Sequence, residues 1–347
     1  MAIGNWGYAG ALAAAAAVAL AVMARGARPP EGSAAGAKAE HVTVADRSPP
    51  RAGHVARDLK ITILSTMLAE SGIGEWGFGA LVDVDGHRIL FDTGRFPDTV
   101  KKNAASLGVD LTTVPDVVLS HHHGDHTGGF LALRDDVRDE EPKALARAHV
   151  GKGFFWPRRA KRGGGNPMIA ARPKFEATGG QWVEHDAPVE LFPGVWLTGP
   201  VPRAHDEKNY GRGVEVDKPS GWAEDDVPED QSLIIDTRRG LVVLSGCGHA
   251  GVVNTLEYAQ KVVRDAHVHA VIGGFHLYQL DDERLAWTAT ELRAMGVEDF
   301  LGAHCTGLEA TYRMRDLLGL ARDHCEVGAV GASFSSDTGI DPLTLAK

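Results

Sequence analysis

The sequence predicts an α/β sandwich, because β-hairpins come first along the chain and helices alternate with strands later. The first hairpin is expected from residues 80–83 and 87–91, which flank an Asp-Gly turn. The second is expected from residues 231–236 and 241–245. Segments with helical and strand spacing then alternate. This order favours a sandwich over a doubly wound parallel sheet.

The other elements follow from local patterns in chain order. Residues 59–64 alternate in polarity and are rich in β-forming types, which predicts the first strand. Residues 97–107 have helical spacing and end at Gly108, a favourable residue just after a helix. Residues 114–119 form an apolar run that leads directly into a row of histidines. Further helices are expected over 130–137, 252–263, 282–295 and 308–318, and further strands over 144–148, 196–198, 268–272 and 300–303.

Two long stretches lack either periodicity and are predicted to be loops. Residues 151–180 are rich in Gly, Pro and Arg, and residues 200–230 are polar and acidic. We expect these loops to determine specificity at the mouth of the site. The basic cluster from Arg158 to Arg162 precedes three glycines, which favours a solvated flexible loop over a lip that binds anions.

The composition is that of a soluble globular protein. Of 347 residues, 44% are hydrophobic and 24% are charged. The net charge of −10 argues against nucleic acid as a partner, since its backbone is bound by clustered Lys and Arg. We therefore expect a small-molecule substrate.

Four of the six residues from His121 to His126 can bind metal ions. His121 and His123 alternate along an extended segment and would point the same way. Gly124 permits a sharp turn, after which Asp125 and His126 can reach a second ion. Zinc-type ions favour neutral imidazole nitrogens and carboxylate oxygens on a rigid edge. The run therefore predicts a two-metal site at the C-terminal end of a strand.

This run, followed by Thr127-Gly128-Gly129, resembles the signature of the metallo-β-lactamase superfamily. Asp92, which closes the preceding strand, is similar to the upstream Asp motif of that superfamily. The resemblance implies a four-layer αββα sandwich and a binuclear metal-dependent hydrolase. It also implies that Asp92 orients a ligand imidazole, with a simple turn residue as the alternative.

Three later histidines, His249, His276 and His304, each follow an apolar strand. With residues 229–233 at the start of the second hairpin, they are similar to the branch typified by dihydropterin-ribofuranosylaminobenzene-phosphate synthase. The likeness runs from about residue 59 to about residue 320. This branch implies an alternative function, a synthase that condenses a pterin with an aminobenzene derivative.

One departure from the superfamily pattern affects the ligand set. The place of the usual Asp that bridges the two metals holds Cys247 or His249. Cys247 is either a thiolate bridge or a small buried residue under the site. Our assignment gives one metal His121, His123 and His249, and the other metal Asp125, His126 and either His276 or His304.

The expected reaction is cleavage of an ester, amide or phosphoester bond. Two close ions would lower the pKa of a bridging water toward ~7, which makes hydroxide available at neutral pH. Asp125 can both bind metal and orient this hydroxide, so it is the predicted catalytic residue. Thr306 precedes the helix expected at 308–318, whose N-terminal amides are expected to hold an anionic group of the substrate.

The sequence leaves alternatives open for the identity of the metal and for the type of function. Zinc is the expected cofactor, with iron or manganese as alternatives. A metal-binding protein without turnover and a redox di-iron site are further possibilities in other functional classes. The three cysteines, Cys247, Cys305 and Cys325, do not form a disulfide framework in so large a chain.

The N-terminal segment predicts export. Residues 2–23 carry no charge, and the small residues Val22 and Ala24 resemble a signal-peptidase site. Because no Lys or Arg precedes the apolar run, a membrane anchor over residues 1–24 is the alternative. Residues 25–57 are predicted to be a flexible linker and residues 58–347 the catalytic domain. We expect a periplasmic or extracellular protein, a location that disfavours a cytoplasmic pterin synthase.

Overall fold

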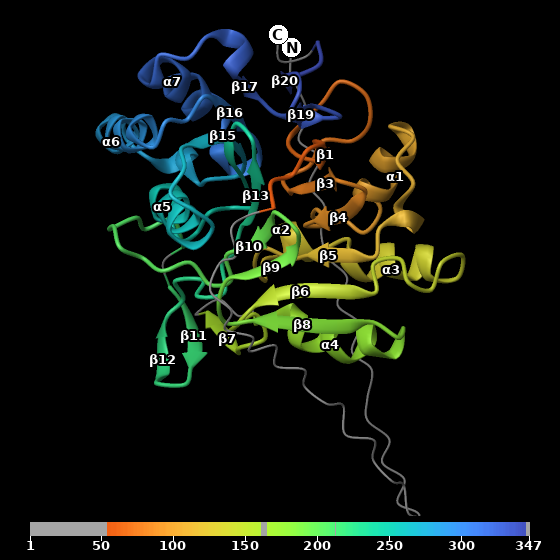
Figure 1. The fold of residues 1–347 in the computed structure, drawn as a ribbon. Coiled ribbons are helices and arrows are strands. Elements are labelled where there is room, and N and C mark those ends of the chain that lie inside the picture. Colours follow the sequence, from red (N-terminus) through yellow and green to blue (C-terminus); the bar gives the residue numbers. More distant parts are fainter. Residues whose placement is uncertain (1–53, 161–164, 212, 345–347) are drawn as a thin grey trace, which may run out of the picture. The chain divides into compact units, whose positions relative to one another are not determined.

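Two β-sheets pack face to face between two sets of helices in this computed structural model, which describes residues 54–160, 165–211 and 213–344 (Figure 1). This arrangement confirms the four-layer αββα sandwich. The expected signal or anchor segment and most of the expected linker lie outside the described residues.

The strands of the described residues form two large sheets and two small ones. In spatial order the first large sheet contains β20 (Gly339–Asp341), β19 (Ser333–Ser335), β1 (Leu59–Ser65), β3 (Gly79–Val84), β4 (His87–Phe91), β5 (Asp116–Val118), β6 (Arg147–Gly151) and β8 (Gln181–His185). The second contains β17 (Cys325–Val327), β16 (Asp299–Gly302), β15 (Val268–Gly273), β14 (Gly240–Ser245), β13 (Leu233–Thr237), β10 (Val195–Leu197) and β9 (Val189–Phe192). The small sheets contain β12 (Gly221–Glu224), β11 (Val214–Lys218) and β7 (Arg158–Ala160), and β18 (Ala329–Val330) with β2 (Leu68–Ala69).

Helices cover the outer face of each large sheet. The described α-helices are α1 (Thr99–Ser106), α2 (Gly124–Thr127), α3 (Phe130–Arg138), α4 (Pro167–Ala177), α5 (Val252–Val262), α6 (Asp282–Ala294) and α7 (Leu308–Leu318). One apolar cluster joins α5, α6 and α7 to the second sheet, and another joins α1, α3 and α4 to the first (Figure 1). A third cluster fills the space between the sheets, where alternate residues such as Ile61, Ile63, Val242 and Leu244 are fully buried. Burial of this apolar surface drives the layers together.

Both predicted hairpins are present. Strands β3 and β4 pair antiparallel around Asp85 and Gly86, which both have positive φ angles as a two-residue hairpin turn requires. Strands β13 and β14 form the second hairpin. The following strands β14, β15, β16 and β17 run parallel to one another, as do β4, β5, β6 and β8 in the first sheet. Since parallel neighbours end at the same edge, the segments after these strands are brought together.

Two stretches that the sequence predicted as loops contain regular structure. Residues 151–180 include β7 and α4, and α4 begins where the Asn166 side chain accepts a hydrogen bond from Met168 N and Pro167 occupies the first turn. Residues 200–230 include the hairpin of β11 and β12. Both loop predictions were therefore wrong in part. The high Gly and Pro content concealed a helix start and a small sheet.

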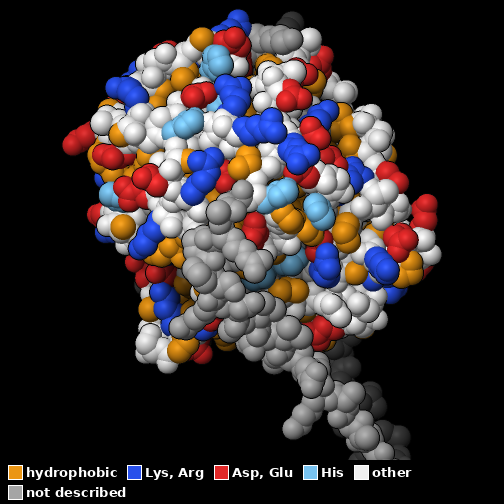
Figure 2. Space-filling view, viewed as in Figure 1, with side chains coloured by type: hydrophobic (Ala, Val, Ile, Leu, Met, Phe, Trp, Pro, Cys, Tyr) orange, Lys and Arg blue, Asp and Glu red, His pale blue; other side chains and the backbone are white. Residues whose placement is uncertain are grey.

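The folded part includes residues that the sequence assigned to the linker. Ala56 is buried, and its N–H donates to the Asp236 carbonyl at 2.8 Å. Within the described residues, no helix combines the length and the apolar character that a membrane span requires. Acidic and basic side chains are interspersed over the face seen in Figure 2.

The packing between the sheets generates a stability prediction. Phe334 on β19 is fully buried in the central cluster, whereas Phe96 is 51% exposed. We expect Phe334→Ala to lower the free energy of unfolding by about 3–5 kcal/mol, because it removes apolar contacts and leaves a cavity. Phe96→Ala, the matched control, should cost less than about 1 kcal/mol. Urea unfolding followed by circular dichroism measures both, and equal losses would contradict this description of the core.

Candidate metal centre

The first predicted ligand set converges at the edge where the parallel strands end. His121 and His123 follow β5, and His249 follows β14 of the opposite sheet. Their donor atoms all lie within 4.8 Å of one another. The Nε2 atoms of His121 and His249 are 3.2 Å apart. The structure thus brings together the three imidazoles that the sequence grouped.

The second predicted set is completed by His304. The donor atoms of Asp125, His126 and His304 lie within 4.8 Å of one another, and Asp125 Oδ2 is 3.4 Å from His304 Nε2. The alternative candidate, His276, lies instead in a group with Cys247 and Cys305. Of the two histidines that the sequence left open, the geometry therefore places His304 beside Asp125.

Asp92 connects the end of β4 to both neighbouring segments. Its carboxylate accepts hydrogen bonds from the backbone N–H and the hydroxyl of Ser120, each at 2.7 Å. It also lies 2.7 Å from Nδ1 of His126. This contact leaves Nε2 of His126 directed toward Cys247, 3.1 Å from its Sγ. Asp92 is placed where an imidazole-orienting carboxylate belongs.

The close approach of these groups explains a glycine in the loop after β14. A Cβ atom on Gly246 would lie 2.2 Å from Ser120 Oγ and 2.4 Å from Asp92 Oδ2. Any side chain at this position would displace the carboxylate that holds His126. The sequence around Cys247 is therefore constrained by packing as well as by chemistry.

Three site residues have left-handed backbone conformations. The φ angles of Asp92, His276 and His304 are 56°, 52° and 46°. Such conformations cost a residue other than glycine of the order of 1–3 kcal/mol, so they persist only where the surroundings enforce them. Their concentration at the strand ends indicates that the fold aims these side chains into one place.

The surroundings lower the pKa of three of these imidazoles and raise the pKa of a fourth. Burial and the neighbouring histidines hold the pKa values of His121 and His249 well below the usual range, and burial lowers that of His123 to about 3. These rings are neutral, which is the form that binds metal. At His126, burial acts against positive charge, but Asp92 and Asp125 outweigh it and raise the pKa to about 9. The carboxylates thus favour a cation at this point.

The donor set fits divalent metal ions. Imidazole nitrogens and a carboxylate converge within coordinating reach of one another, and Nδ1 of the buried His304 has no hydrogen-bond partner. A buried polar atom without a partner is costly unless something else satisfies it. His249 is already oriented through Nδ1, which contacts the backbone carbonyl of Asn209. These are the features of a metal site with outer groups that fix its ligands.

Comparison with known proteins agrees with this geometry. Residues 79–263 match the family model described as the metallo-beta-lactamase superfamily. The 7,8-dihydropterin-6-methyl-4-(beta-D-ribofuranosyl)-aminobenzene-5'-phosphate synthase of Methanocaldococcus jannaschii is 31% identical over 241 residues, 67% of this chain and 82% of the relative. The chain belongs to the metallo-β-lactamase superfamily. The relative also confirms the branch that the strand-end histidines indicate.

Two further relatives span most of their own lengths. The uncharacterized protein MJ0448 of the same organism is 26% identical over 257 residues, 72% of this chain and 90% of the relative. Among solved structures, Tm1679, described as a metal-dependent hydrolase of the beta-lactamase superfamily, superposes with a TM-score of 0.64 at 26% identity. That comparison covers 80% of this chain and 98% of the other.

Thr306 has a place that the sequence did not predict. Its side chain is fully buried, and its hydroxyl donates to the Gly273 carbonyl at 2.8 Å and accepts from Phe275 N at 3.1 Å. The hydroxyl is turned into the protein and joins the loops after β15 and β16. The expected contact between Thr306 and an anionic substrate therefore has no support in this geometry.

An aromatic rim borders the second ligand set, and the sequence analysis missed it. Trp76 and Tyr278 are 39% and 44% exposed, and their ring centroids lie 5.6 Å apart. Trp76 lies 5.0 Å from the His304 ring, and Tyr278 lies 5.6 Å from the His276 ring. Neither aromatic residue belongs to a histidine motif, so only the fold reveals them.

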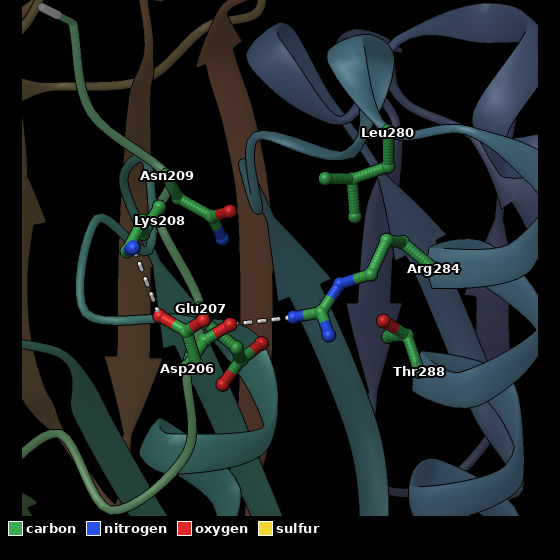
Figure 3. A pocket seen from close by; sticks show the side chains of 7 residues that line it. All are labelled: Asp206, Glu207, Lys208, Asn209, Leu280, Arg284 and Thr288. Carbon is green, nitrogen blue, oxygen red and sulfur yellow. Dashed lines mark hydrogen bonds and ion pairs between the residues drawn. The ribbon is translucent and has the colours of Figure 1, made fainter.

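A polar pocket lies on the other side of His249. It is lined by Asp206, Glu207, Lys208, Asn209, Leu280, Arg284 and Thr288 (Figure 3). Glu207 accepts hydrogen bonds from Val253 N and Asn254 N in the first turn of α5. The pocket wall thus supports both α5 and the Asn209 carbonyl that contacts His249.

A buried ion network lies beneath the histidine run. His122 Nδ1 is 2.6 Å from Glu229 Oε1, and Arg158 pairs with both Glu229 and Asp225. The Arg158 side chain is 2% exposed, so its prediction as part of a solvated loop was wrong. The guanidinium also donates to three backbone carbonyls, those of Gly153, Phe154 and Trp156. This network attaches β7 and its small sheet to the centre.

The network generates a prediction for stability and its pH dependence. Burial opposes the charge of Glu229, but His122 and Arg158 outweigh it and lower the pKa from 4.5 to about 2. Its stabilising contribution is therefore present above the unfolded-state value of 4.5 and is lost as the pH falls toward 2. Glu229→Gln should lower the free energy of unfolding at neutral pH by about 3–5 kcal/mol, because it removes one of the two carboxylates that pair with the buried Arg158.

The control is the exposed pair of Arg159 and Glu215 in the same small sheet. Glu215→Gln should cost less than about 1 kcal/mol. Urea unfolding at a series of pH values compares the two variants with the parent protein. If Glu229→Gln retains the full acid-induced loss of stability, the stabilising role of Glu229 is wrong.

Proposed function

We propose that this protein is a metal-dependent hydrolase that cleaves an ester, amide or phosphoester bond of a small molecule. The observation that supports it is the convergence of His121, His123 and His249, with the Nε2 atoms of His121 and His249 3.2 Å apart. The adjacent set of Asp125, His126 and His304 provides a second position. The structural likeness to a protein described as a metal-dependent hydrolase supports the same assignment.

We propose that the site holds two divalent ions, for which zinc is our first choice, and that different residues bind each ion. Bound divalent metal ions polarise a substrate oxygen and make water acidic enough to react at neutral pH. His121, His123 and His249 would hold one ion, and Asp125, His126 and His304 the other. Asp92 keeps His126 oriented through Nδ1.

Asp125 is the proposed catalytic residue because of its charge and its access. Its side chain is 20% exposed, whereas those of His126 and His304 are fully buried. Asp125 is therefore the member of this set that solvent can reach. Burial opposes its charge, but His126 and His304 keep its pKa well below the usual range, so the carboxylate is ionised. Its oxygen can accept a hydrogen bond from an attacking water and orient it. Trp76 and Tyr278 pack beside the rings of His304 and His276.

Removal of metal tests the proposal directly. We expect purified full-length protein to contain divalent metal, and to hydrolyse at least one class in a panel of chromogenic esters, phosphodiesters and β-lactams. A chelator should abolish turnover, and zinc or manganese should restore it. His249→Ala should reduce turnover by about 100-fold or more, since even outer partners of ligands contribute about 10- to 100-fold.

The matched control is His87→Ala. His87 is exposed and begins β4, at the opposite end of that strand from Asp92. This variant should keep the metal content and the turnover of the parent protein. Metal-free protein that still turns over the substrates, or metal-loaded protein that is inactive across the panel, would contradict the hydrolase assignment.

A synthase that joins a dihydropterin to an aminobenzene is the second candidate. The 31% identity to the synthase of M. jannaschii favours it, and the exposed rings of Trp76 and Tyr278 would suit a planar heteroaromatic substrate. Formation of the coupled product from a dihydropterin with an activated 6-methyl carbon and a ribofuranosylaminobenzene phosphate, followed by mass spectrometry, tests this candidate.

The aromatic rim generates a prediction that applies to either reaction with an aromatic substrate. Trp76→Ala should raise KM about 2- to 10-fold through loss of ring stacking, with a smaller effect on kcat. Trp222→Ala is the control, because Trp222 is 40% exposed on β12 and packs on Arg159. Steady-state kinetics separates the two parameters. An unchanged KM in the Trp76 variant would remove the rim from the substrate site.

A further inference from the structure

Two cysteines distant in sequence meet inside the candidate centre. Cys247 follows β14 and Cys305 follows β16, and the Sγ atoms lie 3.2 Å apart. Both side chains are buried, and both thiols are free. The separation exceeds the ~2.05 Å of a disulfide bond. The strand ends thus bring a pair of thiols to the same edge as the imidazoles.

The side chains around Cys247 and Cys305 are of types that bind metal ions. Cys247 Sγ lies 3.1 Å from Nε2 of His126, and it forms one donor group with His121 and His126. It also forms a second group with Cys305 and His276, whose Nδ1 is buried without a hydrogen-bond partner. Cys247 therefore lies between the position of the three imidazoles and that of the second ligand set.

The third cysteine shows what an ordinary buried thiol looks like in this protein. Cys325 begins β17, and its Sγ donates to the Thr311 carbonyl in the cluster beneath α7. No imidazole is grouped with it among the described residues. Packing alone therefore accounts for Cys325, whereas Cys247 and Cys305 are grouped with His276, whose Nδ1 has no hydrogen-bond partner.

The backbone also makes room for the second sulfur. A Cβ atom on Gly274 would lie 2.9 Å from Cys305 Sγ and 2.0 Å from the Gly246 carbonyl oxygen. The backbone N–H of His276 points at the same sulfur, 3.4 Å away. An N–H directed at sulfur stabilises negative charge on it, as at metal-bound thiolates. The loop after β15 is thus shaped around Cys305.

We propose that the sulfurs of Cys247 and Cys305 bind the cation beside His126, which makes this position a thiolate-containing site for a thiophilic metal. Each thiol loses its proton to solvent on binding. Sulfur ligands select zinc, cobalt or cadmium over manganese and magnesium, which prefer oxygen. The inference rests on the proposed metal centre, but it does not depend on catalytic turnover.

Cobalt(II) provides the test because thiolate ligands give it a charge-transfer absorption in the near ultraviolet. The full-length protein is reduced, freed of metal and titrated with cobalt(II) without oxygen, and bound metal is counted by elemental analysis. We expect the band to grow until the centre is full. Cys247→Ser and Cys305→Ser should each remove a large part of it. Cys325→Ser is the matched control and should leave it unchanged.

A charge-preserving variant keeps the proposal testable if a serine variant folds poorly. Cys247→Asp retains an anionic donor, so it should bind metal, lose much of the cobalt band and shift its preference from zinc toward manganese in competition experiments. Circular dichroism checks the fold of every variant. Parent protein that binds cobalt fully without the band overturns the proposal, as does a band that persists in both the Cys247→Ser and Cys305→Ser variants. An inactive protein that shows the band would fail as a hydrolase while supporting the sulfur ligands.

Discussion

The hydrogen bonds of the Asp92 carboxylate are the constraint on which the centre depends. They join the end of β4 to Ser120 after β5 and to the ring of His126. Because β4 and β5 are parallel neighbours, these contacts connect two strand ends at one edge of the first sheet. Gly246 then allows the loop from the opposite sheet to approach the same carboxylate. One buried acid thereby connects two strand ends of the first sheet to the histidine run and lies against the loop from the second sheet.

Much of the fold and of the first ligand set could be predicted, because both depend on patterns of residues close together in the sequence. The periodicity of residues 308–318 predicted α7 with its observed bounds, and the Asp-Gly turn predicted the first hairpin. His121 and His123 needed only an extended segment. The prediction of His249 as a ligand needed one further assumption. Histidines that follow apolar strands were expected to meet at a shared edge.

The parts that sequence reasoning missed depend on contacts between distant residues. Arg158 is separated by 67 residues from Asp225 and by 71 from Glu229, so its charge run looked solvated. The choice between His276 and His304 depends on where two adjacent loops aim similar side chains, and no local pattern distinguishes them. Asn166 and Pro167 carried the signal for α4, but the surrounding glycines obscured it. Trp76 is distant from His304 in the sequence, and only the folded chain brings the two rings together.

The left-handed backbone at His276 and His304 bears on when the protein meets the energetic cost of aiming these side chains. Since the surrounding loops fix these conformations during folding, the imidazoles are aimed before any ion arrives. These side chains would then hold an ion without a further change of their backbone torsions. The energetic cost of these torsions is thus met when the chain folds.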